Sequence, residues 1–390
     1  MFERFLKINL PQKQSLFLWG PRQAGKTSYL RLQYKDSLFY NLLDTRDFLR
    51  LSQAPYLIRE EILAASPEQL KHPVIIDEIQ KIPLLLNEVH LLIEEHGIAF
   101  ILCGSSARKL KASSVNLLGG RAWPFNFYPL VYPEIPHFDL YRALTQGLIP
   151  KHYLSDPENI RDYFNAYVGV YLTDEIKNEG LVRNLTGFST FLEVAAMNNG
   201  EMLNFTNIAR DCGVSRQSVQ GYYQILVDTF LGYFTFPYSQ KVKRDLIEAT
   251  PKFYFFDVGI ANHLAHQALL DLKGLVAGRA FEHYIFMELT AYKGLRRKSF
   301  EISYWRTKLG LEVDFILGKA LVAIEVKLST QVYQEDLKGL IAFCEEHDKA
   351  QAYVVSQDPR PRDLKVNEQL IIRILPWEIF LKKLWADEII

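Results

Sequence analysis

The stretch SLFLWGPRQAGKTSYL, residues 15–30, joins a short apolar run to a glycine-containing loop. Gly20 is followed by four residues and then by Gly25, Lys26 and Thr27, which is the GxxxxGKT pattern of a phosphate-binding loop. Such glycines let backbone N–H groups curl around phosphate, the lysine reaches the β- and γ-phosphates, the threonine binds Mg²⁺, and the next helix adds its positive N-terminus. The stretch therefore predicts a strand, a loop and a helix that begin an α/β domain. The residues expected to contact a nucleotide are Gly20, Pro21, Arg22, Gln23, Ala24, Gly25, Lys26, Thr27 and Ser28.

Two carboxylates follow the next apolar run, in HPVIIDEIQ, residues 72–80. A strand covered by helices on both faces is apolar throughout and places its first polar residues at its carboxyl end, where ligands sit. We expect Asp77 to hold Mg²⁺ through water. Glu78 is expected to orient or activate an attacking water, so the pair predicts hydrolysis of ATP as well as binding.

A further apolar run, IAFILCGSSA at residues 98–107, ends in Ser105 and Ser106, either of which is a candidate sensor of the γ-phosphate. Arg121, in LLGGRAWPF, is a candidate cationic contact to the nucleotide. It would act within its own subunit or across an interface as an arginine finger. The alternative is an ordinary turn arginine before the next strand.

Composition limits the classes of function. A chain of 390 residues is expected to form two or three domains. Lysine plus arginine and aspartate plus glutamate number 45 each, so attraction to nucleic acid or membrane could come only from local basic patches, KVKR at 241–244 and KGLRRK at 293–298. Three scattered cysteines and the lack of a signal peptide or long apolar run predict a soluble, cytoplasmic protein without zinc, disulfides or a membrane partner.

The middle of the chain predicts a helix-turn-helix. In FTNIARDCGVSRQSVQGYYQILVDTFLGY, residues 205–233, Gly213 suits a turn and Ser215 is a natural N-cap of a second helix. On that helix Val219, Leu226 and either Tyr222 or Tyr223 would pack inward. The side chains left for a DNA major groove are Arg216, Gln217, Gln220 and Gln224. The alternative is a lid or a subunit contact.

The stretch LEVDFILGKALVAIEVKLS, residues 311–329, predicts a hairpin with an acidic face. With Gly318 and Lys319 as a two-residue loop, Leu317 pairs with Ala320 and Asp314 lies opposite Ala323. Asp314 and Glu325 would then be diagonal neighbours with Lys327 beside them, close enough for both carboxylates to bind one Mg²⁺. Glu312 would lie opposite Glu325. The alternatives are a solvated sheet face and a fold used only for binding.

The chain resembles a family of bacterial and archaeal AAA+ ATPases whose nucleotide domain is joined to a C-terminal DUF4143 region. The motifs that carry the resemblance are LWGPRQAGKT, VIIDEIQKIP, ILCGSSARKL, LLGGRAWPFNFYPLVYPE, YFFDVGIAN and YWRTKLGLEVDFI with AIEVK. The resemblance implies an ATPase core, a helical lid, a winged-helix-like middle and a restriction-endonuclease-like C-terminus. Asp314, Glu325 and Lys327 match the PD-(D/E)xK nuclease pattern, and Glu282 matches an additional acid that this superfamily carries on a preceding helix.

These observations together predict an α/β protein with a P-loop domain at residues 1–149, a helical and winged-helix-like domain at 150–250, and a nuclease-like domain at 251–390. The expected function is an ATP- and Mg²⁺-dependent ATPase, directed to DNA rather than RNA, that controls a C-terminal nuclease-like site. A homo-oligomer is expected by analogy. The alternative is an ATP-dependent switch whose C-terminal domain docks nucleic acid or a protein partner.

Overall fold

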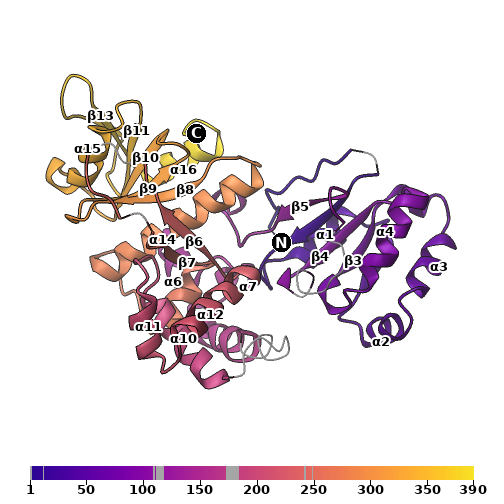
Figure 1. The fold of residues 1–390 in the computed structure, drawn as a ribbon. Coiled ribbons are helices and arrows are strands. Elements are labelled where there is room, and N and C mark those ends of the chain that lie inside the picture. The colour runs from indigo at the N-terminus through magenta and orange to yellow at the C-terminus, as the bar shows by residue number, and fades with distance from the viewer. Residues whose placement is uncertain are drawn as a thin grey trace. The chain divides into compact units, whose positions relative to one another are not determined.

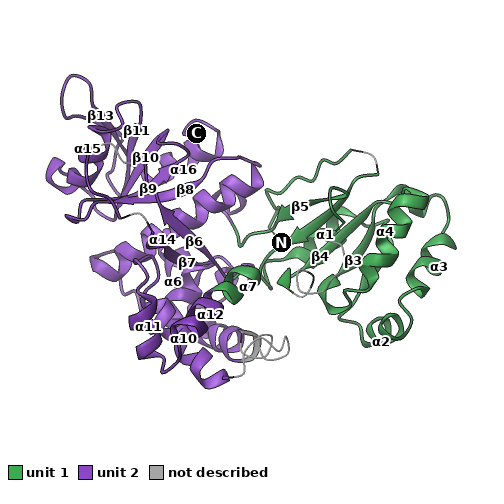
Figure 2. Ribbon diagram, in the orientation of Figure 1, with its two compact units in different colours: residues 1–130, 224–231 green, residues 131–223, 232–390 purple. Residues whose placement is uncertain are grey.

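The computed structural model describes residues 2–11, 13–108, 110, 118–172, 184–240, 243–247 and 249–390. It divides into two compact units (Figures 1 and 2). The first unit is Met1–Leu130 with Gln224–Leu231, and the second is Val131–Tyr223 with Gly232–Ile390. The sequence predicted three domains, whereas the structure keeps the middle and C-terminal parts of the chain in one unit.

The first unit contains a parallel sheet, as predicted. Its five strands, counted over the described part of the unit, lie in the order β2-β3-β4-β1-β5. Each strand runs parallel to its neighbours. The strands β1, β3 and β4 are buried along their whole length, which is why their sequences are nearly continuous apolar runs. The strands are β1 (Ser15–Trp19), β2 (Phe39–Asn41), β3 (Val74–Asp77), β4 (Phe100–Gly104) and β5 (Ala122–Asn126).

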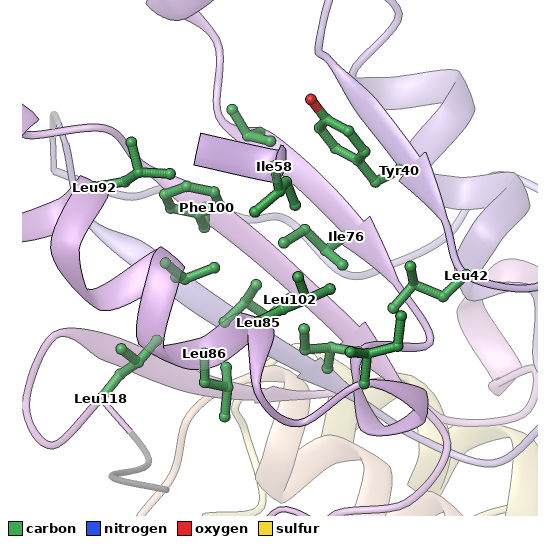
Figure 3. Close-up of a cluster of buried hydrophobic side chains, with 14 of the residues drawn as sticks. Tyr40, Leu42, Ile58, Ile76, Leu85, Leu86, Leu92, Phe100, Leu102 and Leu118 are labelled. Carbon is green, nitrogen blue, oxygen red and sulfur yellow. The ribbon is translucent and has the colours of Figure 1, made fainter. Parts of the chain in front are cut away.

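Helices connect these strands and cover the sheet. They are α1 (Lys26–Gln33), α2 (Thr45–Gln53), α3 (Leu57–Leu63) and α4 (Leu85–His96), with 3₁₀ turns at Gln69–Lys71 and Ile79–Lys81. Alternate side chains of β3 and β4, such as Ile76 and Leu102, pack against Ile58 of α3 and Leu86 of α4 in one apolar core (Figure 3). This core fixes the strands whose carboxyl ends carry the polar residues.

The second unit begins with helices. They are α6 (Leu140–Gln146), α7 (Pro150–Leu154), α8 (Ile160–Asn165), α10 (Leu185–Met197), α11 (Phe205–Asp211) and α12 (Arg216–Asp228), whose last turn belongs to the first unit. The helical pattern predicted for residues 163–176 continues from α8 into a π-helical segment, Ala166–Leu172. The rest of that stretch lies outside the described residues.

A mixed sheet forms the remainder of the second unit. Its eight strands, again among described residues, lie in the order β12-β13-β11-β10-β9-β8-β6-β7. They are β6 (Gly232–Pro237), β7 (Lys252–Phe255), β8 (Ile302–Arg306), β9 (Glu312–Leu317), β10 (Val322–Lys327), β11 (Gln351–Ser356), β12 (Arg362–Lys365) and β13 (Ile371–Pro376). The accompanying helices are α13 (Val258–Leu264), α14 (Gly274–Leu295), α15 (Lys338–Cys344) and α16 (Trp377–Trp385), with a 3₁₀ turn at Gln334–Leu337.

Strand β6 explains why the predicted boundary at residue 250 is not a structural division. It pairs antiparallel with β7 on one side and parallel with β8 on the other. The strand pair that follows α12 therefore completes the C-terminal sheet, and backbone hydrogen bonds join the two predicted domains.

Candidate functional site

The predicted phosphate loop lies at the carboxyl end of β1. Strand β1 is flanked by β4 and β5, and the chain leaves it through the loop and α1 to reach β2 at the far edge of the sheet. In an open α/β sheet, ligands bind outside the carboxyl ends of the strands at such a change of direction. Residues 20–28 therefore stand at the usual ligand position of this fold.

Both glycines of the loop are required by the backbone. Gly25 precedes α1 with φ 101°, a left-handed conformation that glycine adopts without strain. A Cβ atom on Gly20 would lie 2.2 Å from the carbonyl oxygen of Phe127, so a side chain cannot be placed there without moving backbone. The glycine spacing of the motif thus reflects two local steric demands.

The Lys26 side chain is buried and lies inside the loop. Its ammonium group donates hydrogen bonds to the carbonyl oxygens of Gly20 and Pro21, both at 2.8 Å. No ion pair is found for Lys26 within the described ranges, so its positive charge is balanced by no carboxylate contact. A buried cation held by the rim of a glycine loop is suited to binding an anion such as phosphate.

Thr27 and Asp77 place two oxygens together below the loop. The Thr27 hydroxyl donates to Oδ2 of Asp77 at 2.6 Å, and Oδ1 of Asp77 is buried with no hydrogen-bond partner. Burial and the neighbouring Asp77 charge raise the pKa of the Cys103 thiol well above its ordinary value, so the thiol stays neutral there. A hydroxyl beside a carboxylate with an unused oxygen fits the oxygen ligands that Mg²⁺ prefers.

Glu78 is held beside this pair in an uncommon backbone conformation. Its φ is 59°, which is left-handed for a residue that carries a Cβ. Oε2 of Glu78 accepts hydrogen bonds from the Gln80 amide and, at 3.0 Å, from the Ser105 hydroxyl. Left-handed non-glycine residues that the surrounding contacts stabilise are concentrated at functional sites.

Gln80 was given no role by the sequence reasoning. Besides Glu78, its amide nitrogen lies 3.1 Å from the Ser105 hydroxyl. A Cβ on Gly104 would come within 2.5 Å of Oε1 of Gln80, so this glycine makes room for the glutamine. The signal was present in the sequence as a glutamine two residues after Glu78.

The two serines after β4 differ in their partners. Ser105 is buried and bonds to the Glu78 carboxylate, with Nε of Arg22 3.4 Å from its hydroxyl. Ser106 is also buried, and its hydroxyl accepts from the backbone N–H of Arg108 at 3.3 Å. Ser105 therefore belongs to the Glu78 cluster, and its role as a phosphate sensor stays a prediction.

Arg121 does not lie near the loop of its own chain. It directly precedes β5, whose first residue Ala122 pairs with Ser15 at the start of β1, whereas the loop follows the opposite end of β1. Five residues of strand separate the two ends by roughly 16 Å. The Arg121 guanidinium pairs instead with Glu94 near the C-terminus of α4. The expected contact to the nucleotide within one chain is therefore wrong, and the arginine finger across an interface stays a prediction.

The C-terminal hairpin has a different register from the one predicted. Leu317 pairs with Val322 and Phe315 with Ile324, so the loop holds four residues rather than two. Gly318 and Ala320 both have positive φ in this loop. The sequence predicted a two-residue turn at Gly318 and Lys319. The longer loop shifts the pairing of β9 with β10 by two residues, so each side chain stays on the sheet face that was predicted for it.

The new register brings Asp314 next to Glu325. Oδ2 of Asp314 accepts a hydrogen bond from the backbone N–H of Val326 at 2.7 Å, just beyond the last backbone pair of the two strands, Phe315 with Ile324. Oε1 of Glu325 pairs with the Lys327 ammonium at 2.7 Å, and Oε2 is buried with no hydrogen-bond partner. The acid pair and the lysine that the sequence predicted to be neighbours are therefore neighbours.

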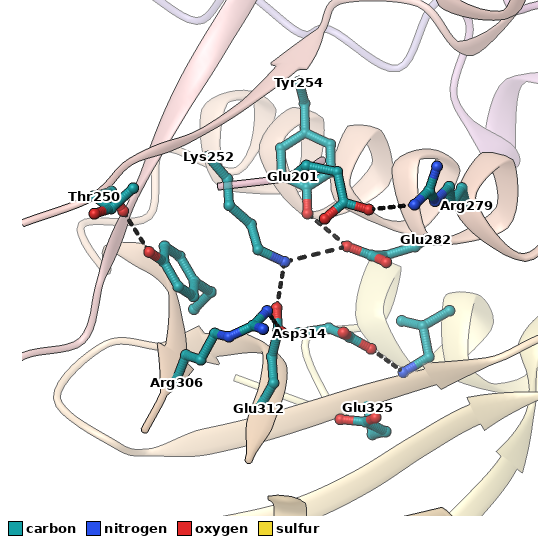
Figure 4. A network of polar contacts seen from close by, with 12 residues as sticks. Glu201, Thr250, Lys252, Tyr254, Arg279, Glu282, Arg306, Glu312, Asp314 and Glu325 are labelled. Carbon is teal, nitrogen blue, oxygen red and sulfur yellow. Dashed lines mark hydrogen bonds and ion pairs between the residues drawn. The ribbon is translucent and has the colours of Figure 1, made fainter. Parts of the chain in front are cut away.

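Glu312 lies between two cations. The predicted register had placed it directly opposite Glu325 without a counter-charge. Its Oε1 lies 2.6 Å from the ammonium of Lys252, and its Oε2 pairs with Arg306 (Figure 4). The predicted pairing of Glu312 directly opposite Glu325 is wrong, although the charge of Glu312 is still among those that raise the pKa of Glu325.

Glu282 joins the same network from α14. Tyr254 of β7 donates a hydrogen bond to Oε1 of Glu282 at 2.6 Å, and the Lys252 ammonium lies 3.8 Å from that oxygen. Glu201 and Arg279 form a 2.7 Å ion pair at the edge of the group (Figure 4). Lys252 and Tyr254 were missed by the sequence reasoning because they precede the predicted nuclease-like motifs by tens of positions.

Burial and mutual repulsion control the charges here. Burial, then the charges of Glu325 and Glu282, raise the pKa of Asp314 well above its usual value. Burial likewise raises the pKa of Glu325, to about 7, although Lys327 opposes the shift. Glu325 therefore takes up a proton near neutral pH, and Asp314 also favours its neutral form.

The predicted C-terminal Mg²⁺ site, Asp314 with Glu325, has lysines beside both carboxylates. Nowhere in the described ranges do three His, Cys, Asp or Glu side chains form a group that could hold a metal ion. The carboxylates of Glu282, Glu312 and Glu325 already pair with Lys252, Arg306 or Lys327. Cations in these positions would repel a divalent ion.

The predicted helix-turn-helix has the expected local structure. Gly213 has φ 64°, and the Ser215 hydroxyl accepts from the Ser218 N–H at 3.0 Å, which confirms the turn glycine and the N-cap. The residues predicted to pack inward are buried: Val219, Tyr222, Tyr223 and Leu226. The residues predicted to face a groove are exposed: Arg216, Gln217, Gln220 and Gln224.

The local basic patches are largely paired with acids. Arg244 binds Glu345 and Glu346 at 2.8 and 2.6 Å, and Lys298 binds Asp387 at 3.0 Å. Residues 241 and 242 of the first patch lie outside the described residues. Cations that are already paired with acids give no independent support for a nucleic-acid site.

Comparison with protein-family models assigns three successive segments. Residues 12–136 match an AAA domain, residues 137–272 match the domain of unknown function DUF8612, and residues 277–380 match the domain of unknown function DUF4143. The resemblance drawn from the sequence motifs is confirmed for its first and last parts. The chain therefore carries an AAA domain and a C-terminal DUF4143 domain.

Two similar proteins are uncharacterized proteins of Mycobacterium bovis and Mycobacterium tuberculosis. Each is 23% identical to this chain over 341 residues, which cover 85% of this chain and 72% of the relative. The similarity reaches into all three matched segments.

Within the described ranges, no helix combines the length and the apolar character that a membrane span requires.

Proposed function

We propose that this chain, which combines an AAA domain with a C-terminal DUF4143 domain, binds and hydrolyses ATP with Mg²⁺ at the phosphate loop. The single observation that carries the proposal is the convergence of Lys26, Thr27, Asp77 and Glu78 from two strand ends onto one edge of the parallel sheet. The AAA-domain match over the same residues supports it.

Each residue has a separate task in this proposal. Lys26 would exchange its bonds to the loop carbonyls for bonds to phosphate oxygens, because an ionised acceptor is stronger than a neutral one. Thr27 and Asp77 would hold Mg²⁺, which neutralises charge on the phosphates. Glu78, oriented by Gln80 and Ser105, would position and deprotonate the attacking water.

Two substitutions test this function. Lys26→Ala is expected to abolish nucleotide binding measured by calorimetry, because it removes the buried ammonium that bonds to the carbonyl oxygens of the loop. Glu78→Gln is expected to bind ATP but turn it over at least about 100-fold more slowly, since a general base contributes about that factor or more. Normal turnover in both variants would overturn the proposal.

A homo-oligomer with Arg121 acting across its interface is part of the same proposal. It is supported by the position of Arg121, which cannot serve the loop of its own chain. ATP turnover per chain would then rise with protein concentration, over the same concentration range in which light scattering detects assembly of the chains. Concentration-independent turnover by a monomer would exclude it.

For the second unit we propose nucleic-acid docking, to DNA rather than RNA, without cleavage. The exposed polar side chains at the start of α12 follow a capped helix N-terminus, which is the part of a recognition helix that contacts base edges. Of the predicted nuclease acids, Glu282 and Glu325 each have a lysine ammonium as a counter-charge, which favours binding over metal-dependent cutting.

Plasmid and linear DNA, incubated with the protein, ATP and Mg²⁺ or Mn²⁺, would distinguish these activities. We expect a salt-dependent complex and no cutting, and Arg216→Ala with Gln217→Ala should weaken binding and reduce its salt slope. Metal-dependent cutting that disappears in Asp314→Ala would establish the nuclease instead. An absence of both binding and cutting would favour a switch that docks a protein partner.

A further inference from the structure

Lys252 is the unusual residue of the C-terminal acidic cluster. Only two lysines are buried in the described part of the chain, Lys26 in the phosphate loop and Lys252 on β7. Lys252 is 4% exposed, yet it lies outside the stretch that carries the predicted nuclease pattern. A buried ammonium is costly unless carboxylates surround it.

Carboxylates from two other elements surround this ammonium. Glu312 of β9 lies 2.6 Å away and Glu282 of α14 lies 3.8 Å away. The ammonium also lies over the aromatic ring of Tyr304, 5.2 Å from the ring centroid. The cation therefore sits at the meeting point of β7, β9 and α14.

Further partners hold these acids and their neighbour Asp314. Tyr254 donates to the same Glu282 oxygen that lies near the ammonium, Arg306 pairs with the other oxygen of Glu312, and the Val326 N–H donates to Asp314. Burial lowers the pKa of Lys252, but Glu282, Glu312 and Asp314 outweigh it and raise that pKa above its ordinary value. The ammonium stays charged throughout the physiological range.

We propose that Lys252 is the built-in cation of this cluster, holding Glu282 and Glu312 beside Asp314, one of the two acids to which the sequence pattern assigns a divalent metal ion. A metal bound beside these acids would have to approach an ammonium already 2.6 Å from one of them. The cluster is thus a metal-free ionic junction that joins β7 to β9 and α14. The inference does not depend on ATP hydrolysis by the first unit.

Metal binding to the full-length, nucleotide-free protein tests the proposal. After chelation and dialysis, Mn²⁺ is titrated and followed by electron paramagnetic resonance. We expect wild type and Asp314→Asn to give the same binding curve. Lys252→Met should bind Mn²⁺ at least about tenfold more tightly, because a positive charge within about 4 Å of the carboxylates is removed. The gain should disappear in Lys252→Met combined with Asp314→Asn.

Two controls keep the test decisive. Lys293→Met removes an ammonium from the surface of α14, where it pairs with Glu301 at 3.3 Å, and should leave Mn²⁺ binding unchanged. Lys252→Arg keeps the charge and should resemble wild type.

A wild-type Mn²⁺ site that is lost in Asp314→Asn would overturn the proposal, and so would a folded Lys252→Met variant with unchanged affinity. If circular dichroism shows that Lys252→Met is unfolded, the comparison of wild type with Asp314→Asn decides the question alone.

Discussion

The hydroxyl of Thr27 donates a hydrogen bond to the carboxylate of Asp77 at 2.6 Å, although 50 positions separate the two residues in the sequence. The contact forms because β1 and β3 both flank β4, so their carboxyl ends meet at one edge. It joins the phosphate loop to the acidic strand end, and the catalytic proposal depends on that juxtaposition.

Separating this pair should weaken Mg²⁺-dependent ATP binding. Thr27→Ala and Asp77→Asn are each expected to reduce affinity for ATP in Mg²⁺ by about 10- to 100-fold, which is typical for partners of a bound metal. Fluorescent ATP titrated with Mg²⁺ and with EDTA measures the effect. Thr45→Ala, an exposed threonine of α2, is the matched control and should leave both curves unchanged. Equal losses with and without Mg²⁺ would argue against a metal role.

Gln80 should act as a positioning residue for Glu78. Gln80→Ala removes the amide that holds the Glu78 carboxylate, so kcat should fall by about tenfold or more while KM changes little. Steady-state ATPase assays separate the two parameters. Gln69→Ala changes an exposed glutamine of the same unit and serves as the control. A rise in KM at constant kcat would place Gln80 in substrate binding instead.

Arg121→Ala should leave ATP affinity unchanged when the protein is dilute and monomeric. The side chain lies at the edge of the sheet opposite the loop and is paired with an exposed glutamate. Stability should change by less than about 1 kcal/mol, because an exposed ion pair contributes little. Calorimetric ATP titration and urea unfolding measure both quantities. A loss of affinity in the monomer would show that the loop and Arg121 meet in solution.

Ser215 should stabilise α12 through its cap. Ser215→Ala is expected to lower the free energy of unfolding by about 1 kcal/mol, since the Ser218 N–H loses its acceptor. Chemical denaturation measures the change. Ser189→Ala, in the middle of α10 and exposed, should instead be neutral or slightly stabilising. Equal effects of both substitutions would contradict the capping role.

Glu288 should make the second unit less stable as the pH rises. Burial raises its pKa to about 8, although Tyr132 N–H and Trp385 Nε1–H donate to the carboxylate at 2.8 Å. The native state keeps the proton that the unfolded chain releases near pH 4.5, so stability is full below that pH and falls until about pH 8. The loss is at most about 1.4 kcal/mol per pH unit. Denaturation of wild type and Glu288→Gln at pH 5.5 and 8 should show a smaller pH effect in the variant, and an equal effect in both would refute it.

Local patterns in the sequence sufficed for several features. The glycine spacing around Lys26 follows from backbone sterics, the apolar run before Asp77 from burial on both sheet faces, and the Ser215 cap from the unpaired amides of a helix start. Each depends on residues within a few positions, so the pattern is readable without a fold. The α/β class of the first unit follows from the same runs.

Features that join distant segments were not readable. The hairpin register depended on whether the turn at Gly318 held two residues or four, and the alternation of side chains fits both. Arg121 was a candidate ligand contact as a cation in LLGGRAWPF, but it precedes β5, and the parallel pairing of β5 with β1 places it at the sheet edge opposite the loop. That pairing joins segments about a hundred positions apart, so no local pattern reveals it.

The sequence by itself determined that one group of polar residues would follow buried apolar strands at the phosphate loop and that the C-terminal acids would share one face of a hairpin, because glycine spacing and strand alternation are local properties. Only the tertiary structure decided what those charges meet. In the first group Lys26 meets backbone carbonyls that a phosphate can replace. In the second, Lys252 arrives from β7 and pairs with Glu312 beside the acids that the local pattern assigned to a metal. The difference lies in long-range pairing, since a buried charge takes its counter-charge from whichever strand the fold places beside it.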